Sequence, residues 1–372
     1  MYEQVRVDIF FIIFYSMVTA MAMMAGGYLM FRRANAIAPD ITPPLRLRRW
    51  VATFFASIAL THAWYMPILF LDDKSDIKTV DLVGGLLDSV TLFPLAIVIL
   101  LVMLQDRRRP LWPVAVMMVP IVIAGILCIA TFSYDYLPMT YAYFLLMCIG
   151  IIVYMVREVR RYGRWLRDNY ADLEHKEVWQ SFLVLAIILL VFGNYVFTSE
   201  GTVYIYAMQV AYVILVGYLL WRVETLSDLG SQARDTEVAS GGQPPSSDVD
   251  GHNLPQTIHD KIGPLLQQHC IDTRLYLQHD LTISQLAQAV GTNRYYLSQY
   301  FSRQGMTYNT YINTLRINHF VCLYRKALAD QRHVTAKQLA SDSGYRSYTT
   351  FSAVFKQLKG QTVTAWMRQT AQ

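Results

Sequence analysis

Two stretches near the C-terminal end combine polar side chains with a helical spacing that suits contact with a nucleic acid. The first follows Gly291 and runs to Ser302, with the apolar Leu297 and Phe301 four residues apart and therefore on one side of a helix. The other side then carries groups that donate and accept hydrogen bonds, as contact with base edges and phosphates requires. These residues are Asn293, Arg294, Tyr295, Ser298 and Gln299.

The arrangement recurs 53 residues further on, after Gly344. Here a helix from Ser347 to about Leu358 places Phe351 and Phe355 inward. Its outward side chains are again polar or basic, and they complete the candidate DNA-contacting set: Arg346, Ser347, Tyr348, Thr349, Ser352 and Lys356.

A short helix precedes each of these two helices. Thr282 caps the first, Gly291 ends it, and its apolar positions fall on one face at i, i+3, i+4 and i+7, namely Ile283, Leu286, Ala287 and Val290. Thr335 opens the second, which Gly344 ends, and a long helix from about Tyr308 to Ala329 lies between the two pairs. A helix, a glycine turn and a second helix form the geometry that sets a recognition helix in a major groove. One copy fits any helical hairpin, whereas two copies favour DNA binding.

The charge of the chain is concentrated in the same region. Residues 258–372 hold 13 Lys and Arg against 5 Asp, a net charge of +8, while the whole chain carries +5. An excess of positive charge favours a polyanionic partner. A soluble helical bundle with solvated polar faces is the alternative, and it gives no reason for this excess.

These residues resemble the AraC/XylS family of transcription regulators over about residues 265–370. The resemblance rests on Leu286-Ala287 with Gly291, Tyr296-Leu297-Ser298 with Phe301, Tyr311-Ile312 with Arg316, Leu339-Ala340, Gly344-Tyr345, Phe351-Ser352, Phe355-Lys356 and Gly360-Gln361-Thr362. Three positions depart from the family pattern. Val363 replaces a usual proline, Ala353 a basic residue and Phe320 a small one. The missing basic group at Ala353 puts one DNA contact of the second unit in doubt.

The resemblance implies two helix-turn-helix subdomains joined by a long helix. It also implies double-stranded promoter DNA as the partner, with two successive major-groove faces about one turn apart. Contact with RNA polymerase, activation rather than repression, and a homodimer are further expectations of this kind.

The first 222 residues have a different character. A membrane span needs about 20 mostly apolar residues. Seven such segments occur, at 8–31, 50–71, 82–104, 111–132, 139–156, 179–198 and 202–221. The sequence therefore predicts an all-α chain, with a seven-helix transmembrane bundle in a lipid bilayer and a C-terminal helical domain that carries two helix-turn-helix units.

The arginines and lysines predict the orientation of this bundle. The loops after the first, third and fifth spans carry 14 basic residues, whereas the alternate loops carry only Lys74 and Lys78. Basic loops stay on the cytoplasmic side. We therefore expect a multi-pass protein of the bacterial cytoplasmic (inner) membrane, with its N-terminus outside and its C-terminal domain in the cytoplasm.

Polar residues within the spans are candidates for sensing a signal ligand. Ionisable groups in a membrane are costly and usually face the bundle interior or a cavity. His62, Tyr65, Asp88 and Asn194 are in this position. A ligand site open to the outside is one interpretation of Asp88 with His62, and a polar pair that packs two helices is the other. The tyrosine also fits an interfacial aromatic belt.

The segment between these regions reads as a tether. Residues 223–257 are acidic, with a net charge of −5, rich in Ser, Gly and Pro, and without apolar periodicity. The expected domains are therefore 1–222 (membrane sensor), 223–257 (linker) and 258–372 (DNA binding). Alternatively, residues 221–229 continue the last span as a signalling helix.

The sequence contains no H-E-x-x-H or G-x-S-x-G motif and no Gly-rich phosphate loop. Neither a cofactor nor a metal is expected. The four cysteines lack metal spacing and are expected to be buried, unpaired thiols. The resulting hypothesis is a membrane-bound one-component transcription regulator and not an enzyme. The alternative is a transporter or channel-like protein with an appended DNA-binding domain.

Overall fold

The computed structural model describes residues 8–32, 35–39, 41–184, 202–229 and 256–371. The chain divides into two compact units. The first consists of Met1–Tyr162 and Val178–Gly230, and the second of Gly163–Glu177 and Ser231–Gln372. The regular elements of the described residues are helices, with one isolated antiparallel bridge between Tyr170 and Thr282. The all-α prediction is confirmed.

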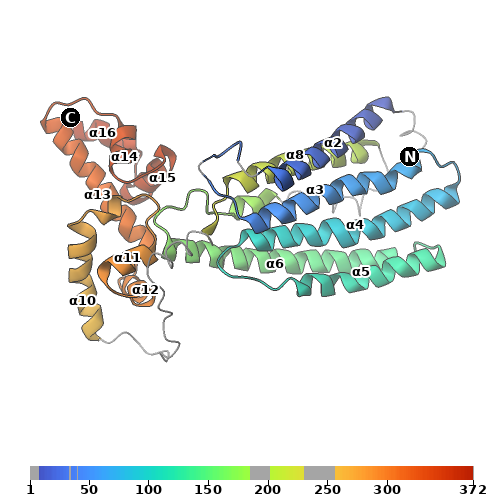
Figure 1. The fold of residues 1–372 in the computed structure, drawn as a ribbon, viewed down its shortest axis with the longest axis horizontal. Helices are drawn as coiled ribbons and strands as arrows, with labels where there is room; N and C mark the ends of the chain where they lie inside the picture. Colours follow the sequence, from blue (N-terminus) through green and yellow to red (C-terminus); the bar gives the residue numbers. More distant parts are fainter. Residues whose placement is uncertain (1–7, 33–34, 40, 185–201, 230–255, 372) are drawn as a thin grey trace. The chain divides into compact units, whose positions relative to one another are not determined.

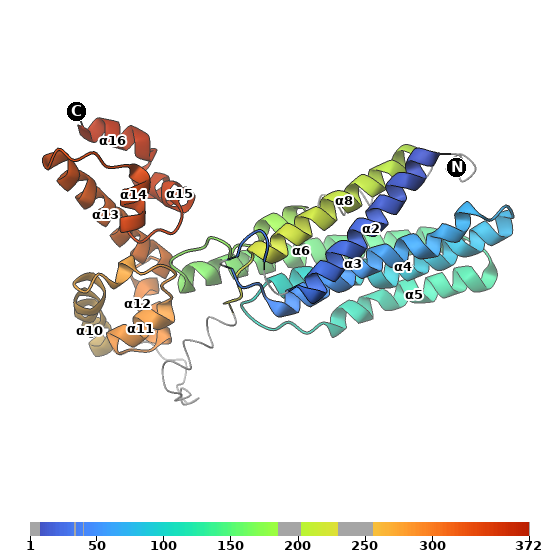
Figure 2. The same cartoon turned by 45° about the horizontal axis from the view of Figure 1, so that its top comes forward.

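Long helices lie side by side in the first unit (Figures 1 and 2). Six of them are long and apolar enough to cross a membrane. Helix α2 packs against α3 and α8, α3 against α4, and α4 against α5. The elements are α2 (Ile9–Phe31), α3 (Leu45–Tyr65), η1 (Met66–Leu69), α4 (Lys74–Met103), α5 (Trp112–Thr131), α6 (Leu137–Asn169) and α8 (Thr202–Thr225).

These helices correspond to six of the seven predicted spans. For the remaining one, 179–198, residues 179–184 are helical and the rest lies outside the described residues. The seventh span therefore stays a prediction.

The apolar surface of the bundle fits a membrane region. Val51, Phe55 and Ile58 of α3 are fully buried between helices. By contrast, Phe10 and Met139 are each 81% exposed. In water such side chains would form apolar patches of a size that monomeric proteins avoid, whereas lipid chains cover them at no cost.

The second unit contains the predicted pairs of short helices. Thr282, Asn293, Thr335 and Ser347 each accept a hydrogen bond from a backbone N–H of the first turn that follows. Its elements are α10 (Gln256–Leu266), η2 (Gln267–Ile271), η3 (Leu275–Leu277), α11 (Ile283–Val290), α12 (Arg294–Arg303), α13 (Tyr308–Ala329), α14 (Ala336–Asp342), α15 (Tyr348–Lys359) and α16 (Val363–Ala371).

Helix α13 takes part in both hydrophobic cores of this unit. Its first turns, with Tyr308 and Ile312, pack with α11 and α12, and its later turns, with Ile317 and Phe320, pack with α14 and α15. The long connecting helix expected from the sequence is thus the shared wall of the two helix-turn-helix units.

The expectation of buried cysteines is right for Cys128 and Cys270 and wrong for Cys148 and Cys322. Cys128 and Cys270 are buried and Cys148 is half-buried, but Cys322 is exposed, and all four are free thiols. Cys322 lies on α13, whose buried side is occupied by larger apolar residues, so the small thiol faces outward.

Candidate nucleic-acid interface

Helix α12 presents the first group of predicted contact residues. Arg294 and Tyr295 are exposed, and Ser298 and Gln299 are half-buried. The amide nitrogen of Gln299 donates to the Tyr295 hydroxyl over 2.6 Å, which holds two of these side chains together. Asn293 caps the helix, because its Oδ1 accepts from the Tyr296 N–H over 2.8 Å. The group is accessible, with one member committed to a cap.

Helix α15 presents the second group in the same way. Tyr348, Thr349 and Lys356 are exposed, Ser352 is half-buried, and Ser347 caps the helix through the Thr350 N–H. Arg346 lies just before the helix, and its Nη1 is 3.3 Å from Oδ2 of Asp280. None of the eleven predicted contact residues is buried. They lie on, or directly before, two equivalent helices.

A buried arginine ties the two helix-turn-helix units together. Arg316 of α13 is 1% exposed and donates to the carbonyl oxygens of Tyr276 and Gln278, each over 2.7 Å. Its guanidinium also lies over the ring of Tyr345, 5.5 Å from the centroid. Burial lowers the pKa of Arg316. Hydrogen bonds to a charged donor are stronger than neutral ones, so Arg316 holds the η3 segment against the turn of the second unit.

Gly344 lies in that turn. Its φ of 88° belongs to the left-handed region, and a Cβ built there would be 2.8 Å from the carbonyl oxygen of Leu277. The Gly344 carbonyl oxygen is 3.1 Å from Nδ1 of His279. This glycine therefore permits both a tight turn and close backbone contact between the two helix-turn-helix units.

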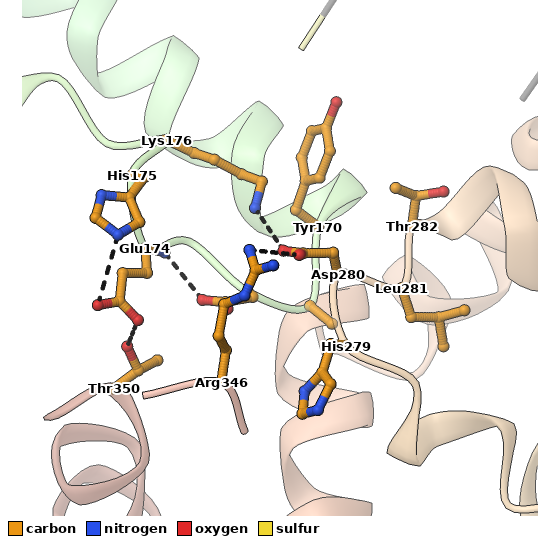
Figure 3. A network of polar contacts seen from close by, with 12 residues as sticks. Tyr170, Glu174, His175, Lys176, His279, Asp280, Leu281, Thr282, Arg346 and Thr350 are labelled. Atoms are coloured by element: carbon orange, nitrogen blue, oxygen red, sulfur yellow. Dashed lines mark hydrogen bonds and ion pairs between the residues drawn. The ribbon is translucent and has the colours of Figure 1, made fainter. Parts of the chain in front are cut away.

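A segment that the sequence did not point to also packs against these elements (Figure 3). Residues 168–177, here called the strap, comprise the last two residues of α6 and the segment that follows it, and they belong to the second unit. The Ala171 N–H donates to the carbonyl oxygen of Leu281 over 3.3 Å, and Ala171 is 2% exposed within the core of the first helix-turn-helix unit. The amides of Asn309 and Asn313 donate to the Ala171 carbonyl oxygen over 2.7 and 3.0 Å.

The C-terminal end of the strap makes polar contacts with both helix-turn-helix units. Lys176 Nζ lies 3.1 Å from Oδ1 of Asp280, and the Thr350 hydroxyl of α15 donates to Oε2 of Glu174 over 2.7 Å (Figure 3). Burial by itself would raise the pKa of Asp280, but the charges of Lys176 and Arg346 outweigh it and lower that pKa. One sequence signal could have pointed to the strap, since its four carboxylates follow a run of arginines.

The predicted sensing residues lie where helices of the first unit meet. His62 is buried, with Nδ1 2.8 Å from the carbonyl oxygen of Ile58 and Nε2 2.9 Å from Oε1 of Gln209 on α8. Its ring lies 4.3 Å from that of Tyr15 on α2. Both ring nitrogens of His62 therefore have partners, one on its own helix and one on α8.

Asp88 of α4 has its own partners on α3. Its Oδ1 accepts from the Thr61 hydroxyl over 3.0 Å and from Trp64 Nε1 over 3.1 Å, and the Tyr65 hydroxyl also bonds to it. Asp88 and His62 are thus held in adjacent networks rather than bonded to each other. Asn194, the fourth predicted residue, lies outside the described residues.

Comparison with known proteins identifies the C-terminal region. A family model described as a helix-turn-helix domain matches residues 286–369. The second unit carries an AraC-type helix-turn-helix domain. The AraC-type domain is similar to uncharacterized HTH-type transcriptional regulators of Staphylococcus aureus, among them those of strains COL and MSSA476, at 28% identity over 116 residues.

The similarity covers a limited part of each protein. It extends over 30% of this chain, and the chain spans about 15% of the length of the curated relatives it matches. No solved structure matches. The family model therefore addresses the AraC-type domain and not the apolar helices of the first unit.

Proposed function

We propose that the chain is a membrane-bound one-component transcription regulator, which senses a signal through its apolar helices and binds promoter DNA through its AraC-type domain. One observation carries this proposal. A single chain joins six helices of membrane-spanning length and composition to two capped helices with accessible polar faces in a domain of net charge +8. Binding of a signal and binding of DNA would then be linked equilibria of one molecule.

The placement of basic residues supports the proposed location. Arg157, Arg160 and Arg161 near the end of the apolar part of α6 are all exposed, as basic residues on the cytoplasmic side of a membrane are. We therefore place the AraC-type domain in the cytoplasm of a bacterium and the N-terminus outside. By the family resemblance we add contact with RNA polymerase, activation and dimerisation to the proposal. The alternative transporter or channel function gains no specific support from the described residues.

The DNA-binding part is tested with the full-length protein in lipid nanodiscs. The protein selects a duplex from a pool of random sequences. Each duplex has about 25 base pairs, which is long enough for two major-groove faces one turn apart. Arg294→Ala and Gln299→Ala should each weaken binding to that duplex by about 1–3 kcal/mol. Arg332→Ala is the matched control, since Arg332 is exposed beyond α13 and bonded to Asp330. Failure to enrich any duplex would refute DNA binding.

The sensing part rests on the networks around His62 and Asp88, which join α2, α3, α4 and α8. A signal that changes the packing of these helices must alter those contacts. His62→Ala and Asp88→Asn should therefore change the output of a promoter reporter in cells and, because the two binding events are linked, the affinity of the full-length protein for its duplex. An unchanged reporter output would contradict sensing at this position.

A further inference from the structure

The strap has a charge opposite to that of the domain on which it lies. Residues 168–177 carry four carboxylates, those of Asp168, Asp172, Glu174 and Glu177, against the single Lys176. The domain itself carries a net +8. Carboxylates that lie against a basic domain reduce the positive potential that would otherwise attract the phosphates of DNA.

The strap also faces a predicted contact helix at each of its ends. At α15, the carboxylate of Glu174 accepts from the Thr350 hydroxyl, one residue from Thr349 of the contact set. At α12, Asp168 lines a hollow of about 310 Å³ together with Ser298 and Ser302. Ser298 is a predicted contact residue. A phosphate that approached either helix from this side would therefore meet a carboxylate.

The charge of Arg294 acts on a residue of the strap as well. Burial raises the pKa of Tyr170 in the strap, and the positive charge of Arg294 acts against that rise. Arg294 and Ser298 are four residues apart and thus on one face of α12. Asp168 of the strap shares a hollow with Ser298 on this face, whereas Tyr295 is 51% exposed.

Burial and backbone contacts hold the middle of the strap in the core of the domain. Ala171 is buried in the domain core, and its carbonyl oxygen takes two amide hydrogen bonds from α13. Tyr170 and Thr282 form an antiparallel bridge. These contacts use backbone groups of the strap and residues outside the contact set, so they can hold the strap without help from the DNA-reading side chains.

We propose that the strap is an autoinhibitory segment, which lies against both DNA-reading helices and must leave them before a duplex can bind. The inference rests on the proposed function and adds its regulation. Helix α6 runs unbroken from the apolar bundle into the first residues of the strap and ends at Asn169. A movement of α6 therefore shifts the equilibrium between a docked and a released strap. The measured Kd for DNA is the intrinsic Kd divided by the released fraction.

The first test removes the amides that bind the strap. Full-length Asn309→Ala/Asn313→Ala in nanodiscs should bind the selected duplex with a Kd at least about five-fold lower than wild type, because the released fraction rises. Asn318→Ala, an exposed asparagine of the same helix, is the matched control and should change nothing. An unchanged or higher Kd of the double variant would overturn autoinhibition, and a higher Kd would show instead that the strap helps binding.

The second test locks the strap and does not depend on weakening the fold. The Ala171-to-Leu281 hydrogen bond makes Tyr170 and Thr282 a non-hydrogen-bonded antiparallel pair, whose Cα atoms are about 4.5 Å apart and within reach of a disulfide. Oxidised Tyr170→Cys/Thr282→Cys should bind DNA at least about ten-fold more weakly than the same protein after reduction. The two single variants control for the lost side chains. Equal or tighter binding in the oxidised form would overturn the proposal.

The outcomes separate the two proposals. If the full-length protein enriches no duplex, DNA binding itself fails and the strap is irrelevant. If a duplex is enriched and neither the asparagine variant nor the disulfide changes its Kd in the stated direction, the proposed function stands and only the autoinhibitory strap is refuted.

Discussion

Replacing Gly344 by alanine tests whether backbone contact fixes the two helix-turn-helix units against each other. An L-residue in the left-handed region costs about 1–2 kcal/mol. The new Cβ would also lie 2.8 Å from the carbonyl oxygen and 2.9 Å from the Cα of Leu277, both backbone atoms that cannot rotate away. Overpacking of this kind costs about 1–3 kcal/mol. Gly344→Ala should therefore destabilise the domain by about 2–5 kcal/mol.

Gly291 provides a matched control in the first helix-turn-helix unit. It has the same role after a short helix and a similar φ of 73°, but nothing lies within 4 Å of its added Cβ. Gly291→Ala should cost only the conformational part, about 1–2 kcal/mol. The difference between the two variants isolates the contact between Gly344 and Leu277.

Hydrogen exchange read by mass spectrometry suits this comparison, because it reports local opening in the full-length protein. Amides of α14, α15 and the later turns of α13 should lose protection in Gly344→Ala by far more than those of α11 and α12 do in Gly291→Ala. Equal losses within about 0.5 kcal/mol would refute the close approach.

Three further outcomes follow from particular contacts. Phe355→Ala should cost about 3–5 kcal/mol in chemical denaturation, because Phe355 is fully buried against Trp366. Glu158→Gln should lower the thermal midpoint in detergent by a few degrees, since it removes a charge 2.7 Å from Arg109 of the same bundle. His319 has a pKa lowered by burial and by a nearby arginine, so the stability it contributes is complete above the ordinary value of 6.5 and falls as the pH drops toward the folded-state pKa. Thermal midpoints at pH 7.5 and 5.5 should thus converge in His319→Gln.

Short-range features of the AraC-type domain were predictable from the sequence. Thr282 and Gln285 form a complete capping box, and Gly291 ends the helix in the left-handed region. Such features depend on residues three or four positions apart, which the sequence displays directly. The apolar spacing of Leu297 and Phe301 likewise gave the buried side of α12 and, by difference, its polar side.

The contacts of the strap were not predictable, because its partners are distant and chemically ordinary. The Asn309 amide bonds to a carbonyl oxygen 138 residues away, and every residue carries such a carbonyl. Asp88 and His62 illustrate the same limit. The sequence marked both as costly polar groups inside spans, but their partners, Thr61 on the neighbouring helix and Gln209 on α8, required the packing of three helices. Spacing along the chain says little about such pairs.

The position of the strap within the chain explains how a small motion could release it. It begins in the last turn of α6, which ends at Asn169, and residues 179–184 after it are again helical. A segment held at both ends by helices moves with them. One residue of an α-helix rises about 1.5 Å and turns by about 100°. A displacement of that size along the bond would take the 2.7 Å contact between Thr350 and Glu174 beyond hydrogen-bond range.

An insertion in α6 makes this reasoning testable. One alanine inserted directly after Gly163 keeps the helix but shifts and rotates everything that follows, so the strap can no longer present Ala171 and Glu174 to their partners together. The full-length insertion variant should bind the selected duplex with a Kd at least about five-fold lower than wild type. An alanine substituted for Gly163, which has open space around its Cβ position, controls for the added helix propensity. Wild-type affinity in the insertion variant would mean that α6 does not govern the strap.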